Sequence, residues 1–264
     1  TPTREHFTFF CKANPWHLCR KTGVERRLLL ALVDVPPVLP WEDMVADPQL
    51  VAFLQQFDDS QLPTLGSDGS CIIATGSEQW QRASWAVAAH LGPTVKGLVP
   101  GIEQTPATGE RFALLQALLA ASVANRPVKL LIDNQAICLR LERGLTYGDW
   151  SGDLPGFWHS VSTLVIAGTS CVWIPSHGKQ PLWKPPAGWL DALLCRQLNA
   201  RADAAASEIC GQFRPGIEAA LVQLAEARKW STGVFQAQLA HSRRYWQVLL
   251  THGSRLEPGR DEDD

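Results

Sequence analysis

The stretch Leu65-Gly-Ser-Asp-Gly-Ser-Cys-Ile-Ile73 constrains the fold more than any other part of the chain. Its length and apolar ends are typical of a buried β-strand, yet a carboxylate, Asp68, stands in its middle. A buried charge without a partner is costly, so a strand here requires compensating groups around Asp68. The alternative is a turn at Asp68 and Gly69 that reverses the chain between two strands. The local sequence leaves both possibilities open.

Length and composition indicate a globular protein with a full core. The 264 residues suffice for one sizeable domain with additions or for two small ones, and 45% are apolar and 19% charged. A net charge of −2 excludes a general attraction to nucleic acid, so such binding must use local basic patches. Seven cysteines without regular spacing indicate reduced thiols in an intracellular compartment, either nucleus or cytoplasm.

No secretory signal or membrane span is visible, because the apolar run 28–33 is too short for either, and no membrane partner is expected. The chain begins at Thr1 and its single methionine is Met44, which indicates a segment of a longer translation product. The expected organisation is a connector over 1–60, a domain over 61–212, a helical extension over 213–254 and a disordered acidic tail over 255–264.

The connector contains Cys11, His17 and Cys19, with His6 nearby. This spacing lacks the close cysteine pair of a zinc knuckle or ribbon, so a packed connector is the better interpretation. Residues 47–57 carry apolar side chains on one helical face and predict a short helix.

The region 61–212 alternates strand and helix patterns. A meander of three antiparallel strands precedes a long helix, and two strands that parallel the first then alternate with further helices. The class is therefore α/β, with a mixed five-stranded sheet flanked by helices. Besides the strand around Asp68, the expected elements are strands at 83–91, 94–99, 128–133 and 171–174 and helices at 108–125, 134–143 and 154–167.

Three further acids interrupt their local patterns. Glu110 shares a helix face with Leu114 and Leu118 and so points toward the sheet, although an acid at a helix N-terminus also interacts favourably with the helix dipole. Asp133 ends a buried strand at the carboxyl edge of the sheet, where it could equally cap the next helix. Asp203 lies on a helix face of small residues and in isolation is typical of a solvated side chain.

Asp68 and these three acids are more informative as a group than any one of them is alone. Four carboxylates at one sheet edge would repel one another without compensation, and hard divalent cations such as Mg²⁺ or Mn²⁺ supply it. Two such ions roughly 3.5–4 Å apart can stabilise both the attacking and the leaving oxygen of a phosphodiester.

Five strings in this order resemble ribonuclease H of type 1, particularly the domains fused to reverse transcriptases in retroelements. They are S-D-G-S at 67–70, G-E-R-F-A-L-L-Q-A-L at 109–118, L-L-I-D-N-Q-A at 130–136, W-I-P-S-H-G at 173–178 and N-A-R-A-D-A-A-A at 199–206. The resemblance covers about residues 61–212. It implies an endonuclease that cuts the RNA strand of RNA–DNA hybrids with two Mg²⁺ ions, Mn²⁺ being an alternative, as part of a retroelement-like polyprotein with an attached reverse transcriptase domain.

The resemblance also assigns roles to individual residues. Asp68 would contact both ions, Asp203 would share the ion that activates water, and Glu110 and Asp133 would hold the other. His177 matches the family's mobile histidine, which assists proton transfer or product release; a plain loop histidine is the alternative.

Substrate contacts are expected from five further residues. Asn134 and Gln135 match positions that touch the RNA strand, and Ser70 could reach a backbone phosphate or a 2′-hydroxyl. Arg140 and Lys179 are candidates for phosphate contacts, with solvated surface charge as the alternative. The loop that follows is longer than usual in the family, which indicates an insertion at about 179–198 with an extra helix at 189–198.

The region 213–254 shows two apolar helical stripes and predicts an αα-hairpin packed on the core or on a partner domain.

Two rival functions use the same fold: an integrase or transposase that acts on DNA, and a non-catalytic module that binds hybrids. The W-I-P-S-H string and the presence of all four acids disfavour them.

Overall fold

The structure is a computed structural model, and it describes residues 44–58, 60–73, 80–101, 103–144, 155–175 and 180–253. The chain forms two compact units. One, the sheet unit, is Val35–Ile217, and the other contains Thr1–Asp34 and Glu218–Asp264. Each unit is described by itself. His6, Cys11, His17, Cys19, His177 and Lys179 lie outside the described residues.

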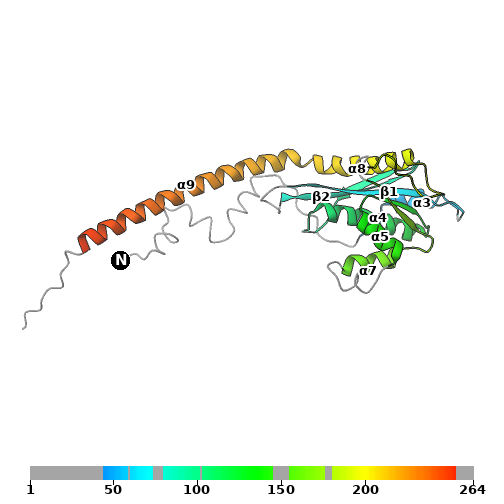
Figure 1. The fold of residues 1–264 in the computed structure, drawn as a ribbon, viewed down its shortest axis with the longest axis horizontal. Helices are drawn as coiled ribbons and strands as arrows, with labels where there is room; N and C mark the ends of the chain where they lie inside the picture. The colour runs from blue at the N-terminus through cyan, green and yellow to red at the C-terminus, as the bar shows by residue number, and fades with distance from the viewer. Residues whose placement is uncertain are drawn as a thin grey trace, which may run out of the picture. The chain divides into compact units, whose positions relative to one another are not determined.

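The described part of the sheet unit contains a five-stranded mixed sheet with the order β3-β2-β1-β4-β5 (Figure 1). β1 pairs with β2, and β2 with β3, in antiparallel fashion, whereas β1 pairs with β4, and β4 with β5, in parallel. The predicted fold class is confirmed. The strands are β1 (Thr64–Ile72), β2 (Arg82–Ala89), β3 (Thr94–Leu98), β4 (Lys129–Ile132) and β5 (Ser170–Trp173).

The possibility of a turn at Asp68 and Gly69 is wrong. β1 runs through both residues without a break, and Asp68 lies opposite Ala86 while Gly69 lies opposite Trp85 on β2. The continuous ladder with β2 satisfies the backbone, so the chain does not need to reverse here. The carboxylate of Asp68 is therefore held in the interior of the sheet, where only 5% of the residue is exposed.

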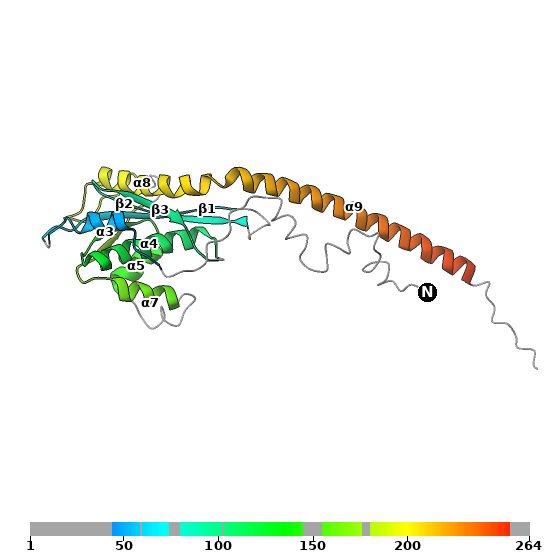
Figure 2. The same cartoon turned by 180° about the vertical axis from the view of Figure 1, so that it is seen from behind.

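Helices cover both faces of the sheet (Figure 2). On one face, Leu65 of β1 packs with Leu114 of α4 in the main core. On the other, Leu131 of β4 packs with Leu198 and Ala202 of α8. The helices of the sheet unit are α3 (Pro48–Leu54), α4 (Pro106–Ala124), α5 (Gln135–Arg143), α7 (Pro155–Leu164) and α8 (Ala192–Gly211).

Helix starts follow from local capping. Thr105 caps α4, where its hydroxyl accepts the Thr108 N–H at 3.1 Å, and Asp191 caps α8, where its carboxylate accepts the Leu194 N–H at 2.9 Å. Side-chain oxygens satisfy the first N–H groups of a helix, which have no partner within it. The extra helix predicted at 189–198 is not separate, because residues 192–198 form the first turns of α8.

The packed core begins before residue 61, where the predicted domain starts. Leu50 and Leu54 of α3 are 1% and 0% exposed and belong to the main core cluster. The helix predicted at 47–57 is thus present as α3, and it closes the core rather than connecting to it. Burial of two leucines stabilises this arrangement by about 3–6 kcal/mol before the entropy of ordering is counted.

The described residues of the other unit, 218–253, all belong to a single helix, α9 (Arg214–Gly253, 40 residues). The αα-hairpin predicted for 213–254 is wrong. The only candidate break between the two apolar stripes is Gly233, and one glycine costs a helix only about 1 kcal/mol relative to alanine. Phe235, Leu239 and Trp246 of the second stripe are 48%, 37% and 54% exposed. Among the described helices, none has the length and apolar character needed to cross a bilayer.

Candidate active site

Asp68 occupies the centre of the candidate site. Its Oδ1 accepts a 2.7 Å hydrogen bond from the Gly69 N–H. Side chains alternate along a strand, so Asp68 shares a face of β1 with Gly66 and Ser70. That face is covered by α8, because a Cβ at Gly66 would lie 3.2 Å from Leu198 Cγ.

The pairing of β1 with β4 brings Asp133 beside Asp68. The last parallel partners are Ser67 and Ile132, so Asp68 and Asp133 follow them at the same level of the sheet. β4 ends there, whereas β1 continues to Ile72. Beyond Asp68, no strand among the described residues pairs with β1 on the side where β4 lies. The edge of β1 next to Asp68 is therefore open. The Asp133 carbonyl accepts a 3.0 Å hydrogen bond from Trp173 Nε1, which fixes the backbone after β4.

Two glycines bring Glu110 to the same place. A Cβ on Gly69 would lie 2.7 Å from Gly109 Cα and would overlap the backbone nitrogen of Glu110. A Cβ on Gly109 would lie 2.6 Å from the Ser84 carbonyl oxygen. Only residues without a side chain allow the first turn of α4 to touch β1 this closely. Gly69, which follows Asp68, therefore contacts Gly109, which precedes Glu110. This backbone contact carries Glu110 toward Asp68.

Asn134 holds the Glu110 side chain. Its Nδ2 donates a 2.6 Å hydrogen bond to Glu110 Oε2, and its Oδ1 accepts the Ile137 N–H at 3.1 Å as the N-cap of α5. Asp133 was the alternative cap for this helix, but Asn134 takes that position. The carboxylate of Asp133 is not needed to start α5.

Asp203 reaches the site from α8. The hydroxyls of Ser70 and Ser207 lie 3.3 Å apart, and Ser84 Oγ donates a 2.6 Å hydrogen bond to the Ala206 carbonyl. Asp203 precedes Ser207 by one helical turn and so lies on the same helix face. Since Ser70 and Asp68 also share a face, Asp203 approaches Asp68. Asp203 is partly buried, as expected of a side chain directed at the sheet rather than at water.

The four acids share one electrostatic environment. Burial, followed in order of effect by the negative charges of Asp133, Asp203 and Glu110, raises the pKa of Asp68 to about 8. The other three carboxylates are therefore close enough to Asp68 to influence its charge. Their roles in catalysis stay predictions.

The donor set suits a hard divalent cation. Carboxylate oxygens are the ligands that Mg²⁺ and Mn²⁺ prefer, and a cation would reverse the charge repulsion that raises the pKa of Asp68. The four carboxylates are not drawn tightly together: no three of them place an oxygen within 4.8 Å of one another. Glu110 instead contacts the amide of Asn134.

The predicted substrate-contact residues lie in different settings. Ser70 and Asn134 contact Ser207 and Glu110 inside the site, whereas Gln135 is exposed in the first turn of α5. Arg140 is exposed further along α5, and its guanidinium lies 5.1 Å from the centre of the Trp158 ring. That contact favours packing on α7 as one role of Arg140.

Gln104 supports the site and was missed by sequence reasoning. Its Oε1 accepts the Ala83 N–H at 2.8 Å, and its Nε2 donates to the carbonyls of Val99 and Gly101 at 2.9 and 2.8 Å. The side chain therefore joins β2 to the segment that leads into α4. A glutamine in a polar loop gives no local signal of burial, so only the fold identifies it.

No protein-family model matches the chain. No curated protein matches it either.

Several solved structures are similar to the chain in fold. LC11-RNase H1 from compost, in complex with an RNA/DNA hybrid, is 16% identical with a TM-score of 0.39, over 57% of this chain and 97% of that one. RNase H1 of Halobacterium salinarum is 20% identical with a TM-score of 0.37, over 58% and 99%. The RNase H domain of prototype foamy virus is 15% identical with a TM-score of 0.43, over 56% and 93%.

Proposed function

We propose that the chain is a metal-dependent endonuclease that cuts the RNA strand of an RNA–DNA hybrid. The observation that carries the proposal is the electrostatic interaction of Asp68 on β1 with three acids from α4, from the turn after β4 and from α8, namely Glu110, Asp133 and Asp203. Mutual repulsion among carboxylates destabilises the folded state. Such an arrangement is unusual in a structural core and is typical of functional sites.

Each element contributes a defined part of the site. β1 holds Asp68 rigidly between its neighbours, and the close contact of Gly69 with Gly109 carries Glu110 toward it. Asn134 orients Glu110 through a charge-assisted hydrogen bond. Bound divalent cations would lower the pKa of a water molecule and neutralise charge on the leaving oxygen.

The hybrid is proposed as the substrate because the five sequence strings resemble ribonuclease H in order and, over most of the match, in spacing. A hybrid differs from duplex DNA by the 2′-hydroxyl groups of one strand, which a polar side chain can recognise. Ser70 and Gln135 are the residues proposed to make such contacts, since they lie near or at the edge of the acidic cluster. Attachment to a reverse transcriptase domain, as in retroelements, is part of the same proposal.

Cleavage of end-labelled substrates tests the proposal directly. The full chain with Mg²⁺ should cut the RNA strand of a hybrid, leave single-stranded RNA and duplex DNA intact, and lose this activity in EDTA. Asp68→Asn and Asp133→Asn should each abolish cleavage. Glu208→Gln is the matched control on α8, because Glu208 pairs with Lys96 at the surface, and it should cut normally.

The same assay separates the rival functions. Cutting or joining of duplex DNA would identify an integrase-like or transposase-like enzyme. Binding of the hybrid without cleavage, at any concentration of Mg²⁺ or Mn²⁺, would identify a non-catalytic module. Full hybrid cleavage by Asp133→Asn would show that the acidic cluster is not the active site.

A further inference from the structure

A second group of potential metal ligands lies away from the acidic cluster, between α5 and β5. Cys138, Glu142 and Cys171 place their sulfur and oxygen atoms within 4.8 Å of one another. Among the described residues, this is the one group of three or more histidine, cysteine, aspartate or glutamate side chains that does so. Neither the sequence motifs nor the proposed nuclease activity uses it.

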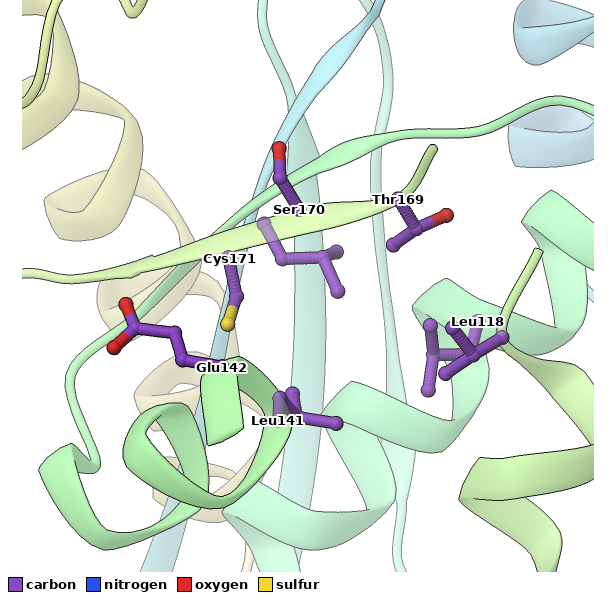
Figure 3. A pocket seen from close by; sticks show the side chains of 8 residues that line it. Leu118, Leu141, Glu142, Thr169, Ser170 and Cys171 are labelled. Carbon is purple, nitrogen blue, oxygen red and sulfur yellow. The ribbon is translucent and has the colours of Figure 1, made fainter. Parts of the chain in front are cut away.

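The arrangement follows from the fold. Cys138 and Glu142 are four residues apart on α5 and therefore share a helix face, and Cys171 lies in β5, which is an edge strand of the sheet. Figure 3 shows the Cys171 sulfur directed toward α5, the helix that carries Glu142. Three ligands from a helix and a strand thus converge without any rearrangement of the backbone.

The spacing matches a tetrahedral site. Zinc–sulfur bonds of about 2.3 Å and zinc–oxygen bonds of about 2.1 Å imply sulfur–sulfur and sulfur–oxygen separations of about 3.8 and 3.6 Å around a tetrahedron. Cys138 Sγ lies 3.6 Å from Cys171 Sγ and 3.5 Å from Glu142 Oε1. The third pair, Cys171 Sγ and a Glu142 oxygen, lies within 4.8 Å. Two of the three separations therefore match a tetrahedral site, and a shift of the exposed Glu142 side chain completes the third.

The surroundings give solvent access to the three ligands. A cavity of about 300 Å³ adjoins Glu142 and Cys171, with Thr169 and Ser170 as its other polar residues and Leu118 and Leu141 among its apolar ones (Figure 3). Cys138 is 1% exposed, whereas Glu142 lies at the surface. Three protein ligands with water in the fourth position, reached from a cavity, is a known form of zinc coordination.

We propose that Cys138, Glu142 and Cys171 bind one thiophilic divalent cation of the zinc type, distinct from the cations proposed for the acidic cluster. Thiolates select zinc over magnesium, and carboxylates with water select magnesium, so the two sites differ in the ion they take. Binding releases the two thiol protons to solvent and ties α5 to β5. Since α5 begins directly after Asp133 and Asn134, the ion fixes the helix that supports the acidic cluster.

The unbound Cys138 thiol is not suited to nucleophilic chemistry. The contact with Cys171, burial and the nearby Glu142 all raise the pKa of Cys138, so it is a thiol rather than a reactive thiolate at neutral pH. The five cysteines among the described residues are all free. A cation changes this balance because a coordinated thiol loses its proton.

Cobalt substitution tests the proposal. The parent for the experiment is the full chain with Cys11→Ser and Cys19→Ser, which removes the only cysteines outside the described residues. Titration of the reduced parent with Co²⁺, in excess Mg²⁺ to occupy the acidic cluster, should give one equivalent of binding, a thiolate-to-cobalt charge-transfer band and the visible bands of a tetrahedral ion. Zn²⁺ should displace the cobalt and remove the bands, and Mg²⁺ should not.

Variants assign the ligands. Cys138→Ser and Cys171→Ser should each lose the equivalent and the bands, whereas Cys195→Ser, which removes a buried cysteine of α8, should keep both. Glu142→Gln should weaken Co²⁺ binding and keep the circular dichroism of the parent. Absence of the bands in the parent, or their persistence in Cys138→Ser, would overturn the proposal.

Two measurements need no substitution of the proposed ligands. X-ray absorption of the zinc-loaded parent should show two sulfur neighbours and lighter ligands, and one sulfur or none would overturn the proposal. Zinc should also protect Cys138 and Cys171 from alkylation in the reduced protein. None of these readings depends on hybrid cleavage, so the metal site and the nuclease proposal succeed or fail separately.

Discussion

Asn134 joins the acidic cluster to the start of a helix through the two ends of one amide. Its nitrogen donates to Glu110 Oε2 at 2.6 Å, and its oxygen accepts the Ile137 N–H at 3.1 Å. The two partners fix the orientation of the amide, because a carboxylate accepts and a backbone N–H donates. The position of Glu110 therefore depends on the same side chain that begins α5.

Replacing Asn134 with aspartate should separate these two roles. Asn134→Asp keeps an oxygen for the Ile137 N–H, so the free energy of unfolding should change by less than about 1 kcal/mol in Mg²⁺. It removes the donor to Glu110 and adds a negative charge, so kcat for hybrid cleavage should fall about 10–100-fold. Asn134→Ala should lose both stability and activity. Unchanged cleavage by Asn134→Asp would show that orientation of Glu110 is unimportant.

Gly69→Ala should destabilise the sheet unit by about 3 kcal/mol or more. The new Cβ would overlap the backbone of Gly109 and Glu110, which no rotamer change can relieve. Gly156→Ala is the control, because a Cβ on this helical glycine of α7 meets nothing within 4 Å. It should be neutral or stabilising by up to about 1 kcal/mol. Urea denaturation compares the two, and equal stability would argue against a close contact between β1 and α4.

The stability of the metal-free protein should fall as pH rises through the acidic and neutral range. Asp68 has a pKa of about 8 when folded and an ordinary value of 3.8, so the folded state holds a proton that the unfolded state has released. The free energy of unfolding should therefore decrease between about pH 4 and pH 8, by roughly 6 kcal/mol at most, and level off above.

Asp68→Asn isolates this effect, since asparagine does not titrate. The stability of the variant in EDTA should lack the decrease, whereas Glu208→Gln should retain it. Saturating Mg²⁺ should also reduce the decrease in the unmodified protein, because a bound cation favours the carboxylate. Thermal denaturation across this pH range provides the measurement. Parallel curves for the unmodified protein and Asp68→Asn would contradict the prediction.

Gln104→Met should be strongly destabilising despite its similar size. It leaves the Ala83 N–H and the carbonyls of Val99 and Gly101 without their present partner, and an unmet buried hydrogen bond costs about 1–3 kcal/mol. A loss of about 3 kcal/mol or more is expected in chemical denaturation. Gln56→Met, at an exposed position after α3, should change stability by less than about 0.5 kcal/mol. Similar losses for both would mean that Gln104 is replaceable by packing alone.

Local patterns were sufficient for most of the sheet unit. The strands around Asp68 and Asp133 and the helix after Asn134 have strong hydrophobic or capping signals that hold in the folded protein. The single helix α9 is a case that local sequence patterns do not decide. Two apolar stripes separated by a glycine describe a hairpin and a long helix equally well, and the difference depends on what the stripes contact.

Among the sites, residue type and order pointed to the four acids, because carboxylates in apolar settings are rare enough to be noticed one at a time. Their approach to one another was decided by tertiary contacts: the register of Ser67 with Ile132, the touch of Gly69 on Gly109 and the pairing of Ser70 with Ser207. The cluster of Cys138, Glu142 and Cys171 has no linear signature at all, since its members are ordinary on their own elements. Chain order records what each residue prefers locally, whereas distances between residues far apart in sequence arise only when the sheet and its helices pack.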